Sequence, residues 1–217
     1  MENLIQELIK EGYLKTPLII EAFRKIKRED FVLEEYKDEA DINVPLPIGY
    51  GQTISQPLTV AFMLELLQPQ PGDKILDIGS GSGWQTALLA YCVKPKGKIF
   101  ALEIIPELME FGKRNVAKYN FLAPYRTEGS GSGVEKGIVE FVCSDGSKGL
   151  EREAPFDKII VAASAQKLSE EWKKQLKING RIVAPIKESI WLLIKKDDDV
   201  FEEHEFPGFV FVPLIYD

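Results

Sequence analysis

The sequence has only one histidine and two cysteines among its 217 residues, and these shortages narrow the chemistry open to it. A single histidine, His204, argues against a Ser-His-Asp triad or a histidine-rich metal site. It lies among glutamates, so we expect it to be an exposed surface side chain. Cys92 and Cys143 lie in apolar stretches without the spacing of metal ligands, which predicts buried, reduced thiols and no metal site.

The sequence also lacks long apolar runs and an excess of basic charge. No apolar run is long enough to cross a bilayer, and Met1–Lys10 mixes acidic and basic residues, unlike a signal peptide. The net charge of −7 disfavours a broad nucleic-acid surface. We expect the cluster Lys25–Arg28 to be a solvated helix face. These features predict a cytoplasmic protein that binds neither membranes nor nucleic acid, and we expect a monomer.

A strand, a glycine-rich turn and a helix form the most informative stretch of the chain. Lys74–Ile78 is an apolar run that predicts a short buried strand, and Trp84–Ala90 has the apolar spacing of a helix. The turn between them alternates glycine and serine, and glycine allows a ligand to approach the backbone closely. A flexible linker without a ligand is the alternative, but linkers rarely lie between a buried strand and an amphipathic helix.

The spacing of these glycines separates two classes of ligand. Dinucleotide sites use G-x-G-x-x-G, whose third glycine would fall where this chain has Trp84. Asp77 followed by glycines at positions 79, 81 and 83 instead matches D/E-x-G-x-G-x-G, the pattern of S-adenosylmethionine-dependent methyltransferases. The turn is therefore predicted to bind S-adenosylmethionine.

Two acidic residues follow later predicted strands. Glu103 ends the strand Lys98–Glu103, about twenty residues beyond the glycines, where an acid commonly accepts hydrogen bonds from ribose hydroxyls. A cap for the helix that begins near Pro106 is the alternative role. Asp145 follows the strand Ile138–Cys143. It is either a turn residue or, at the sheet edge where ligands bind, a contact for adenine.

Strands and helices alternate along most of the chain and consecutive strands close it. This predicts an α/β fold in one domain over residues 1–217, with a doubly wound, mostly parallel sheet, helices on both faces and an antiparallel C-terminal strand. Asn179-Gly180 is expected to be a turn. The remaining predicted strands are Phe156–Ala162, Arg181–Pro185, Ile190–Ile194, Val200–His204 and Phe209–Leu214, and the remaining helices are Asn3–Tyr13, Thr16–Lys27, Pro106–Tyr119 and Ser169–Lys177.

Residues 1–57 are expected to form an N-terminal helical segment that also contributes to a substrate site. Thr16 is predicted to cap the second helix, and residues 28–41 to form helix or loop. Asn43–Pro57 holds three prolines and two hydroxyl residues, Thr53 and Ser55, just before a helix. Either Ser55 or Gln56 lies near the cap of that helix, and on residue type alone Ser55 is a plain N-cap. Alternatively, the two hydroxyls and nearby backbone amides bind a carboxylate at the helix N-terminus.

Six stretches of the sequence together resemble one enzyme family. They are GYGQTISQP, GSGSGW, SDGSKGL, FDKIIVAAS, LKINGRIVAPI and FVPL, in this order between about Val44 and Leu214. The chain thereby resembles the protein-L-isoaspartate O-methyltransferases, a family with a Rossmann-like S-adenosylmethionine methyltransferase fold. The T-I-S-x-P motif is much more specific to this family than the glycines are.

The resemblance implies an activity and a set of site residues. Members of the family transfer the methyl group of S-adenosylmethionine to the α-carboxyl of L-isoaspartyl residues in damaged proteins, which starts their repair to aspartyl. The implied catalytic residue is Ser55, and the implied substrate contacts are Thr53, Ile54, Val212, Pro213 and Leu214. The implied cofactor contacts are Asp77, Gly79, Ser80, Gly81, Ser82 and Gly83 for the methionine end, Glu103 for the ribose, and Asp145 and Gly146 for the adenine.

The sequence departs from the family pattern at two places. Tyr50 stands where the family usually has histidine, and the stretch 122–137, which contains the linker-like segment Glu128–Gly133, is longer than expected. Two other functions are alternatives to this activity. A methyltransferase acting on RNA or a small molecule is disfavoured by the T-I-S-x-P motif and the acidic charge. A non-catalytic adaptor is disfavoured because Ser55, Glu103 and Asp145 are intact.

Overall fold

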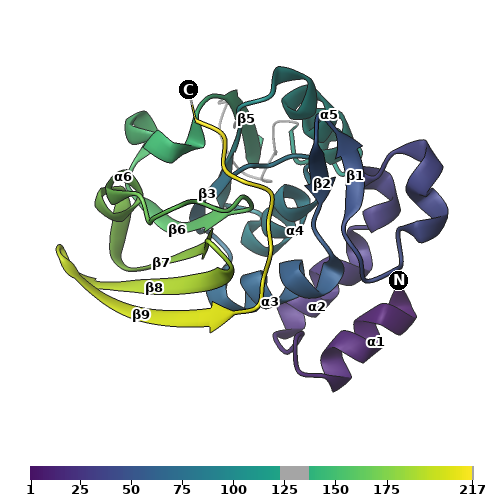
Figure 1. Cartoon of the computed structure of the whole chain (residues 1–217), viewed down its shortest axis with the longest axis horizontal. Coiled ribbons are helices and arrows are strands. Elements are labelled where there is room, and N and C mark those ends of the chain that lie inside the picture. The colour runs from purple at the N-terminus through teal and green to yellow at the C-terminus, as the bar shows by residue number, and fades with distance from the viewer. Residues whose placement is uncertain (123–136, 217) are drawn as a thin grey trace, which may run out of the picture.

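A computed structural model describes residues 1–122 and 137–216 of the chain. Its centre is a seven-stranded sheet in the order β5-β4-β3-β6-β7-β8-β9 (Figure 1). The strands β5, β4, β3, β6 and β7 are parallel, whereas β8 and β9 are antiparallel to their neighbours. The predicted fold class is confirmed. The strands are β3 (Lys74–Ile78), β4 (Lys98–Glu103), β5 (Val139–Cys143), β6 (Phe156–Val161), β7 (Leu176–Ile186), β8 (Ser189–Asp197) and β9 (Val200–Pro207).

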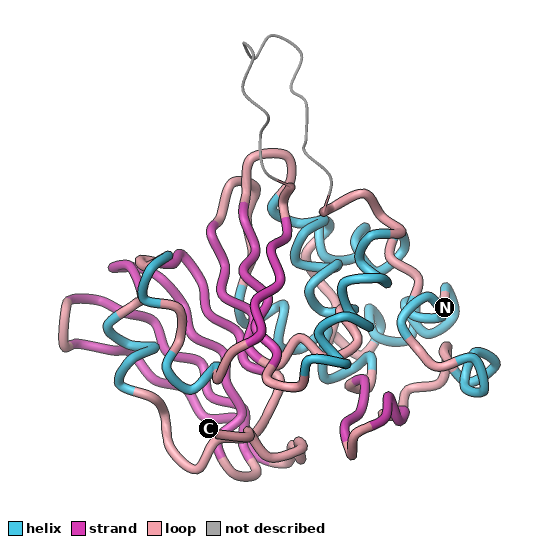
Figure 2. Tube along the Cα trace, turned by 90° about the horizontal axis from the view of Figure 1, so that it is seen from above, coloured by secondary structure: helices cyan, strands magenta, loops and turns pink. Residues whose placement is uncertain are grey.

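The two faces of the sheet are covered unequally. Side chains alternate along each strand, so Ile75 and Ile99 belong to one buried cluster and Leu76 and Phe100 to another. The first cluster includes residues of the five longer helices, whereas the second includes Trp172 of α6. Figure 2 shows most helices gathered on one side of the strands. The helices are α1 (Glu2–Lys10), α2 (Pro17–Lys25), α3 (Pro57–Leu67), α4 (Trp84–Val93), α5 (Pro106–Ala117) and α6 (Glu170–Lys174).

Two short helices, within the range expected to be helix or loop, and an unexpected hairpin lie between α2 and α3. Residues 28–41 form two 3₁₀ helices, η1 (Arg28–Phe31) and η2 (Glu34–Glu39). A small antiparallel hairpin follows, made of β1 (Leu46–Gly49) and β2 (Gln52–Ile54), with Tyr50 at its turn in a left-handed conformation (φ 54°). The hairpin's apolar side chains are buried, which fixes it against the main domain.

Some predicted elements differ from those in the structure. Residues 209–214 form no strand apart from one isolated bridge at Pro213, and α6 ends at Lys174 because β7 begins two residues later. Asn179 is not a turn before the strand but part of an irregularity inside β7, with φ 64°. A Cβ atom on Gly180 would lie 2.8 Å from the carbonyl oxygen of Asp157, so only glycine allows this close approach between the strands.

The scarce residues occupy different environments. Cys92 in α4 is buried as predicted, but Cys143 is exposed, because β5 is the edge strand of the sheet. His204 on β9 is exposed, as expected, with its ring 2.8 Å from Glu202. No helix in the described ranges is long and apolar enough to span a membrane. The linker-like segment 128–133 lies outside the described residues.

Candidate active site

The glycine-rich turn connects β3 to α4 and contacts α5 closely. Gly79, Gly81 and Gly83 all have positive φ angles, as the alternation of glycine suggests. A Cβ atom on Gly83 would lie 2.8 Å from the carbonyl oxygen of Gly112 in α5, and one on Gly112 would lie 2.7 Å from that of Gly81. Glycines on both sides therefore let the turn and α5 touch through their backbones.

Asp77 lies near the end of β3, just before this turn, and is not among the residues that line the main cavity described below. Its carboxylate is fully buried and accepts hydrogen bonds from Gln85 Nε2 (2.9 Å) and Thr86 Oγ1 (2.6 Å), both in α4. Burial raises the pKa of Asp77 to about 6, although these two donors oppose the shift. Asp77 therefore joins the end of β3 to the start of α4. Direct cofactor contact by Asp77 stays a prediction.

Glu103 joins the same turn to the start of α5. Its Oε2 accepts a hydrogen bond from the amide of Gly81 (2.9 Å), and its Oε1 accepts one from the amide of Ile105, the N-cap residue of α5 (3.1 Å). Glu103 thus accepts a hydrogen bond at the N-terminus of α5, which is close to the capping role considered for it. Each carboxylate oxygen can still accept a second hydrogen bond, so the ribose role stays a prediction.

Asp145 is a turn residue in this structure. Its Oδ1 accepts from the amide of Ser147 (2.8 Å) at the start of the 3₁₀ helix η3 (Gly146–Lys148), and its Oδ2 is 3.5 Å from Lys148 Nζ. Its neighbours Ser144 and Gly146 line the main cavity, whereas Asp145 does not. Contact with adenine stays a prediction for Asp145 and Gly146.

The main cavity lies at the carboxyl ends of β3, β4 and β6, beside the point where the strand order reverses. Its empty space, which includes open solvent, is about 790 Å³. The lining includes Gly79, Ser80, Gly81, Ser82, Glu103, Gly146, Thr53, Ile54, Ser55, Val212, Pro213 and Leu214. The structure thus brings nearly all of the predicted site residues together.

Buried polar atoms without partners mark this cavity. Ser80 Oγ, Trp84 Nε1 and Ser144 Oγ are buried and make no hydrogen bond to any part of the chain that the structure describes. All three residues line the cavity. Because a buried polar atom without a partner costs stability, three of them around one space indicate a polar ligand. Trp84 and Ser144 stand in the stretches GSGSGW and SDGSKGL but are not among the predicted site residues.

Ser55 is not the cap of α3. The N-cap position belongs to Gln56, and the amide of Leu58 donates instead to Asn43 Oδ1 (2.9 Å), 15 residues upstream. Ser55 is half-buried, and in the described ranges its hydroxyl makes no hydrogen bond. The plain N-cap interpretation of Ser55 is therefore wrong. Thr16 does stand at the N-cap of α2, but its hydroxyl bonds Glu65 (2.7 Å) rather than capping the helix.

Arg28 corrects the interpretation of the basic cluster as a solvated face. Its side chain is fully buried, and both Nη atoms donate to backbone carbonyl oxygens, including that of Ser55 (3.2 Å). Burial lowers the pKa of Arg28 to about 10, which leaves the guanidinium protonated at neutral pH. A single basic residue beside exposed lysines has no sequence signal that distinguishes it from them.

The C-terminal segment crosses the carboxyl edge of the sheet (Figure 1). Ser164 holds it through two backbone hydrogen bonds, from its amide to the Val212 carbonyl and from the Leu214 amide to its own carbonyl, both 2.8 Å. A second, outer cavity lies beside this segment and shares Thr53, Ser55, Ala162 and Val212 with the main cavity. Ser55 thus stands where two cavities meet.

Comparison with known proteins agrees with this geometry. A protein-L-isoaspartate O-methyltransferase of Methanopyrus kandleri is 39% identical over 99% of this chain and 90% of its own. One of Pyrobaculum islandicum is 40% identical over 98% and 97%. A crystal structure of a Plasmodium falciparum protein in complex with S-adenosyl-L-homocysteine has a TM-score of 0.82 at 23% identity, and the match covers 99% of this chain and 98% of that one.

The family described as protein-L-isoaspartate(D-aspartate) O-methyltransferase (PCMT) matches residues 1–217. A match over the whole chain, together with relatives near 40% identity at almost full length, leaves no segment outside the similarity. This chain, with its two cavities at Ser55 and the glycine turn, therefore belongs to the protein-L-isoaspartate O-methyltransferase family.

Proposed function

We propose that this protein transfers a methyl group from S-adenosylmethionine to the α-carboxyl of L-isoaspartyl residues in damaged proteins, and so initiates their repair to aspartyl. The observation that supports this most is the meeting of two cavities at Ser55. One cavity lies against the glycine turn, where a methyl donor would bind, and the other lies beside residues 208–212, where a protein substrate would approach. Membership of the family points to the same reaction.

The residues present fit S-adenosylmethionine. Gly79 and Gly81 line the main cavity without a side chain, which leaves the backbone of the turn open to a ligand. Ser80 Oγ and Ser144 Oγ are available as partners for polar groups of the cofactor. We assign the methionine end to Gly79, Ser80, Gly81, Ser82 and Gly83, the ribose to Glu103 and the adenine to the Ser144–Gly146 turn. When bound, S-adenosylmethionine supplies an electrophilic methyl group on a sulfonium.

The chain's own residues position the acceptor rather than activate it. A carboxylate is already ionised at neutral pH, so the reaction needs no general base and no histidine. The free hydroxyl of Ser55 can donate to one carboxylate oxygen and leave the other to face the methyl donor, with Thr53 and Ile54 beside it. Val212, Pro213 and Leu214 cover the site and exclude water.

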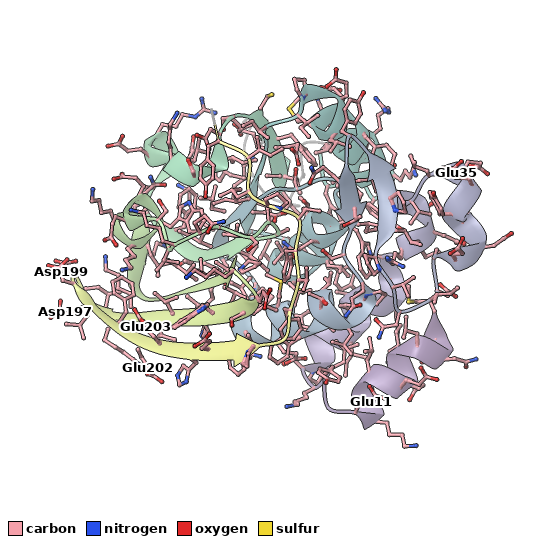
Figure 3. The ribbon with its side chains drawn as sticks, in the orientation of Figure 1. Glu11, Glu35, Asp197, Asp199, Glu202 and Glu203 are labelled. Carbon is pink, nitrogen blue, oxygen red and sulfur yellow. The ribbon has the colours of Figure 1, made fainter. Side chains whose placement is uncertain are left out.

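The charge of the exposed edge strand β9 bears on the oligomeric state of the protein. The outer strand β9 is exposed and acidic, and Figure 3 shows Asp197, Asp199, Glu202 and Glu203 at the outer side of the β8–β9 hairpin. Like charges there oppose pairing with the same edge of a second copy. We therefore propose a monomer that binds damaged proteins and no nucleic acid, in the cytoplasm. Residues 1–57 share one buried cluster with the sheet, which supports a single domain.

Radiolabelled methyl transfer tests the function. The substrate is a peptide that contains L-isoaspartate, and the matched control is the same peptide with aspartate. We expect label in the first only, in a product that loses its methyl group in mild base, as an ester does. Equal labelling of both peptides would refute the proposed substrate, and cofactor binding without transfer would favour the adaptor function.

A further inference from the structure

Arg28 is the residue whose placement the reaction described above does not explain. It is a fully buried cation, and no carboxylate in residues 1–122 or 137–216 lies within ion-pair distance of it. Its neighbours in sequence differ, because Arg24 pairs with Glu2 and Lys27 with Glu29 at the surface. A buried charge without a counter-ion is costly, whereas an apolar side chain would fill the same space without that cost.

Backbone carbonyl groups take the place of the missing counter-ion. Arg28 Nη1 donates to the carbonyls of Ala40 (3.0 Å) and Ile42 (3.2 Å). Arg28 Nη2 donates to those of Val44 (2.8 Å) and Ser55 (3.2 Å). All four acceptors belong to the chain between η2 and α3. The guanidinium therefore organises this segment and not a distant surface.

The two acceptors of Nη2 lie on opposite sides of the β1–β2 hairpin. Val44 precedes β1 and Ser55 follows β2, so one nitrogen atom joins the chain that enters the hairpin to the chain that leaves it. The hairpin itself has only three pairs in register and an irregularity next to its turn. A ladder this short is marginal by itself, so the contact at its base matters for the position of Ser55.

Arg28 also connects this base to the glycine turn. Its Cζ lies 5.5 Å from the centroid of the Trp84 ring, the first residue of α4, which lines the main cavity. The same ring contacts Phe23 of α2 edge-on, with centroids 5.5 Å apart. Arg28 thus lies between the segment that ends in Ser55 and the helix that begins at the cofactor turn.

We propose that Arg28 is a positioning residue for the methyl acceptor: by joining Val44 to Ser55 over the face of Trp84, it holds the Thr53–Ser55 segment in line with the methyl donor. This inference rests on the proposed function. It differs from a stability role, because it requires a defect in use of the isoaspartyl peptide that cofactor binding does not share. The reason is that Arg28 contacts the acceptor segment directly and the cofactor turn only through Trp84.

Two substitutions and a matched control test the proposal. Arg28→Lys keeps the charge, but its single ammonium cannot place two planar nitrogens on four carbonyls. Arg28→Met removes both the charge and the donors. The control is Arg181→Met, which removes another arginine that donates to one backbone carbonyl, that of Leu66 near the C-terminal end of α3 (2.7 Å). Arg181 lines neither cavity at Ser55.

The measurements are kcat and KM for the isoaspartyl peptide, the Kd of S-adenosylhomocysteine by calorimetry, and hydrogen exchange of residues 46–54, all per folded molecule. For Arg28→Lys we expect at least a tenfold loss of kcat/KM, faster exchange in 46–54 and a Kd within twofold of the parent value. Arg28→Met is expected to lose at least as much kcat/KM as Arg28→Lys. Arg181→Met is expected to stay within twofold of the parent in kcat/KM, in exchange of residues 46–54 and in Kd.

Two results would overturn the proposal. One is a kcat/KM within twofold of the parent in Arg28→Lys. It would show that the positive charge alone suffices, or that neither the charge nor the hydrogen bonds of Arg28 affect use of the peptide. The other is an equal loss in Arg181→Met, which would reduce Arg28 to general stability. If Arg28→Met does not fold, Arg28→Lys still decides between these outcomes. An unmodified protein that fails to label the isoaspartyl peptide would instead refute the proposed function.

Discussion

Replacing Ser55 with alanine separates its proposed catalytic role from a structural one. The structure places Gln56 at the N-cap of α3 and gives the capping hydrogen bond to Asn43, while the Ser55 hydroxyl has no partner in the described ranges. The change therefore removes no hydrogen bond from the folded chain. We expect the free energy of unfolding to change by less than about 0.5 kcal/mol, as for substitutions that break no specific contact.

The same substitution should slow the reaction. A hydrogen bond to a charged group contributes about 1.5–3 kcal/mol, which corresponds to roughly a 10- to 150-fold loss of turnover if Ser55 orients the acceptor carboxylate. No covalent intermediate is lost, because the acceptor is already an anion. Steady-state kinetics on the isoaspartyl peptide should show lower kcat, with the affinity for S-adenosylhomocysteine unchanged. Ser55→Thr keeps the hydroxyl but adds a methyl group, and should recover part of the activity.

Asn43→Ala is the matched control for this experiment. It removes the side chain that does cap α3, so it should cost about 1 kcal/mol of stability, measured by urea unfolding. Turnover per folded molecule should fall less than in Ser55→Ala. The reasoning is refuted if Ser55→Ala is destabilised like Asn43→Ala and keeps the parent turnover.

Three further predictions concern the cofactor turn, a buried acid and the thiols. Glu103→Ala should weaken S-adenosylhomocysteine binding by about 1.5–3 kcal/mol, since it removes the ribose acceptor and the contact with Gly81; unchanged affinity in calorimetry would contradict the ribose assignment. Burial raises the pKa of Asp77 to about 6, so its neutral form favours folding. As pH rises from 4 to 7, the parent should lose roughly 2–3 kcal/mol of unfolding free energy relative to Asp77→Asn, and parallel pH profiles would contradict this. A thiol reagent should modify exposed Cys143 in the folded protein and Cys92 only after unfolding, because burial raises the pKa of Cys92 to about 12; equal rates would contradict the structure.

Local signals account for what could be predicted. The apolar run of β3, the glycines after it and the apolar spacing of α4 each depend on residues a few positions apart, and they were sufficient to predict the glycine turn that lines the main cavity. Of the predicted acids, Glu103 lines the main cavity, whereas Asp77 and Asp145 do not. Asp77 and Asp145 satisfy nearby backbone or side-chain donors, a choice that depends on which donors the fold brings within reach.

By itself, the sequence determined the α/β class, the glycine turn at positions 79–83 and the type of reaction, because φ requirements, strand and helix periods and the spacing of motifs are local properties of the chain. Only the tertiary structure decided that Asn43 caps α3 and that Ser55 is free, since the capping contact spans 15 residues. It also decided that Arg28 is buried and joined to Ser55, and that Ser55 and Val212 line two cavities. Burial and long-range hydrogen bonds depend on which segments meet in space.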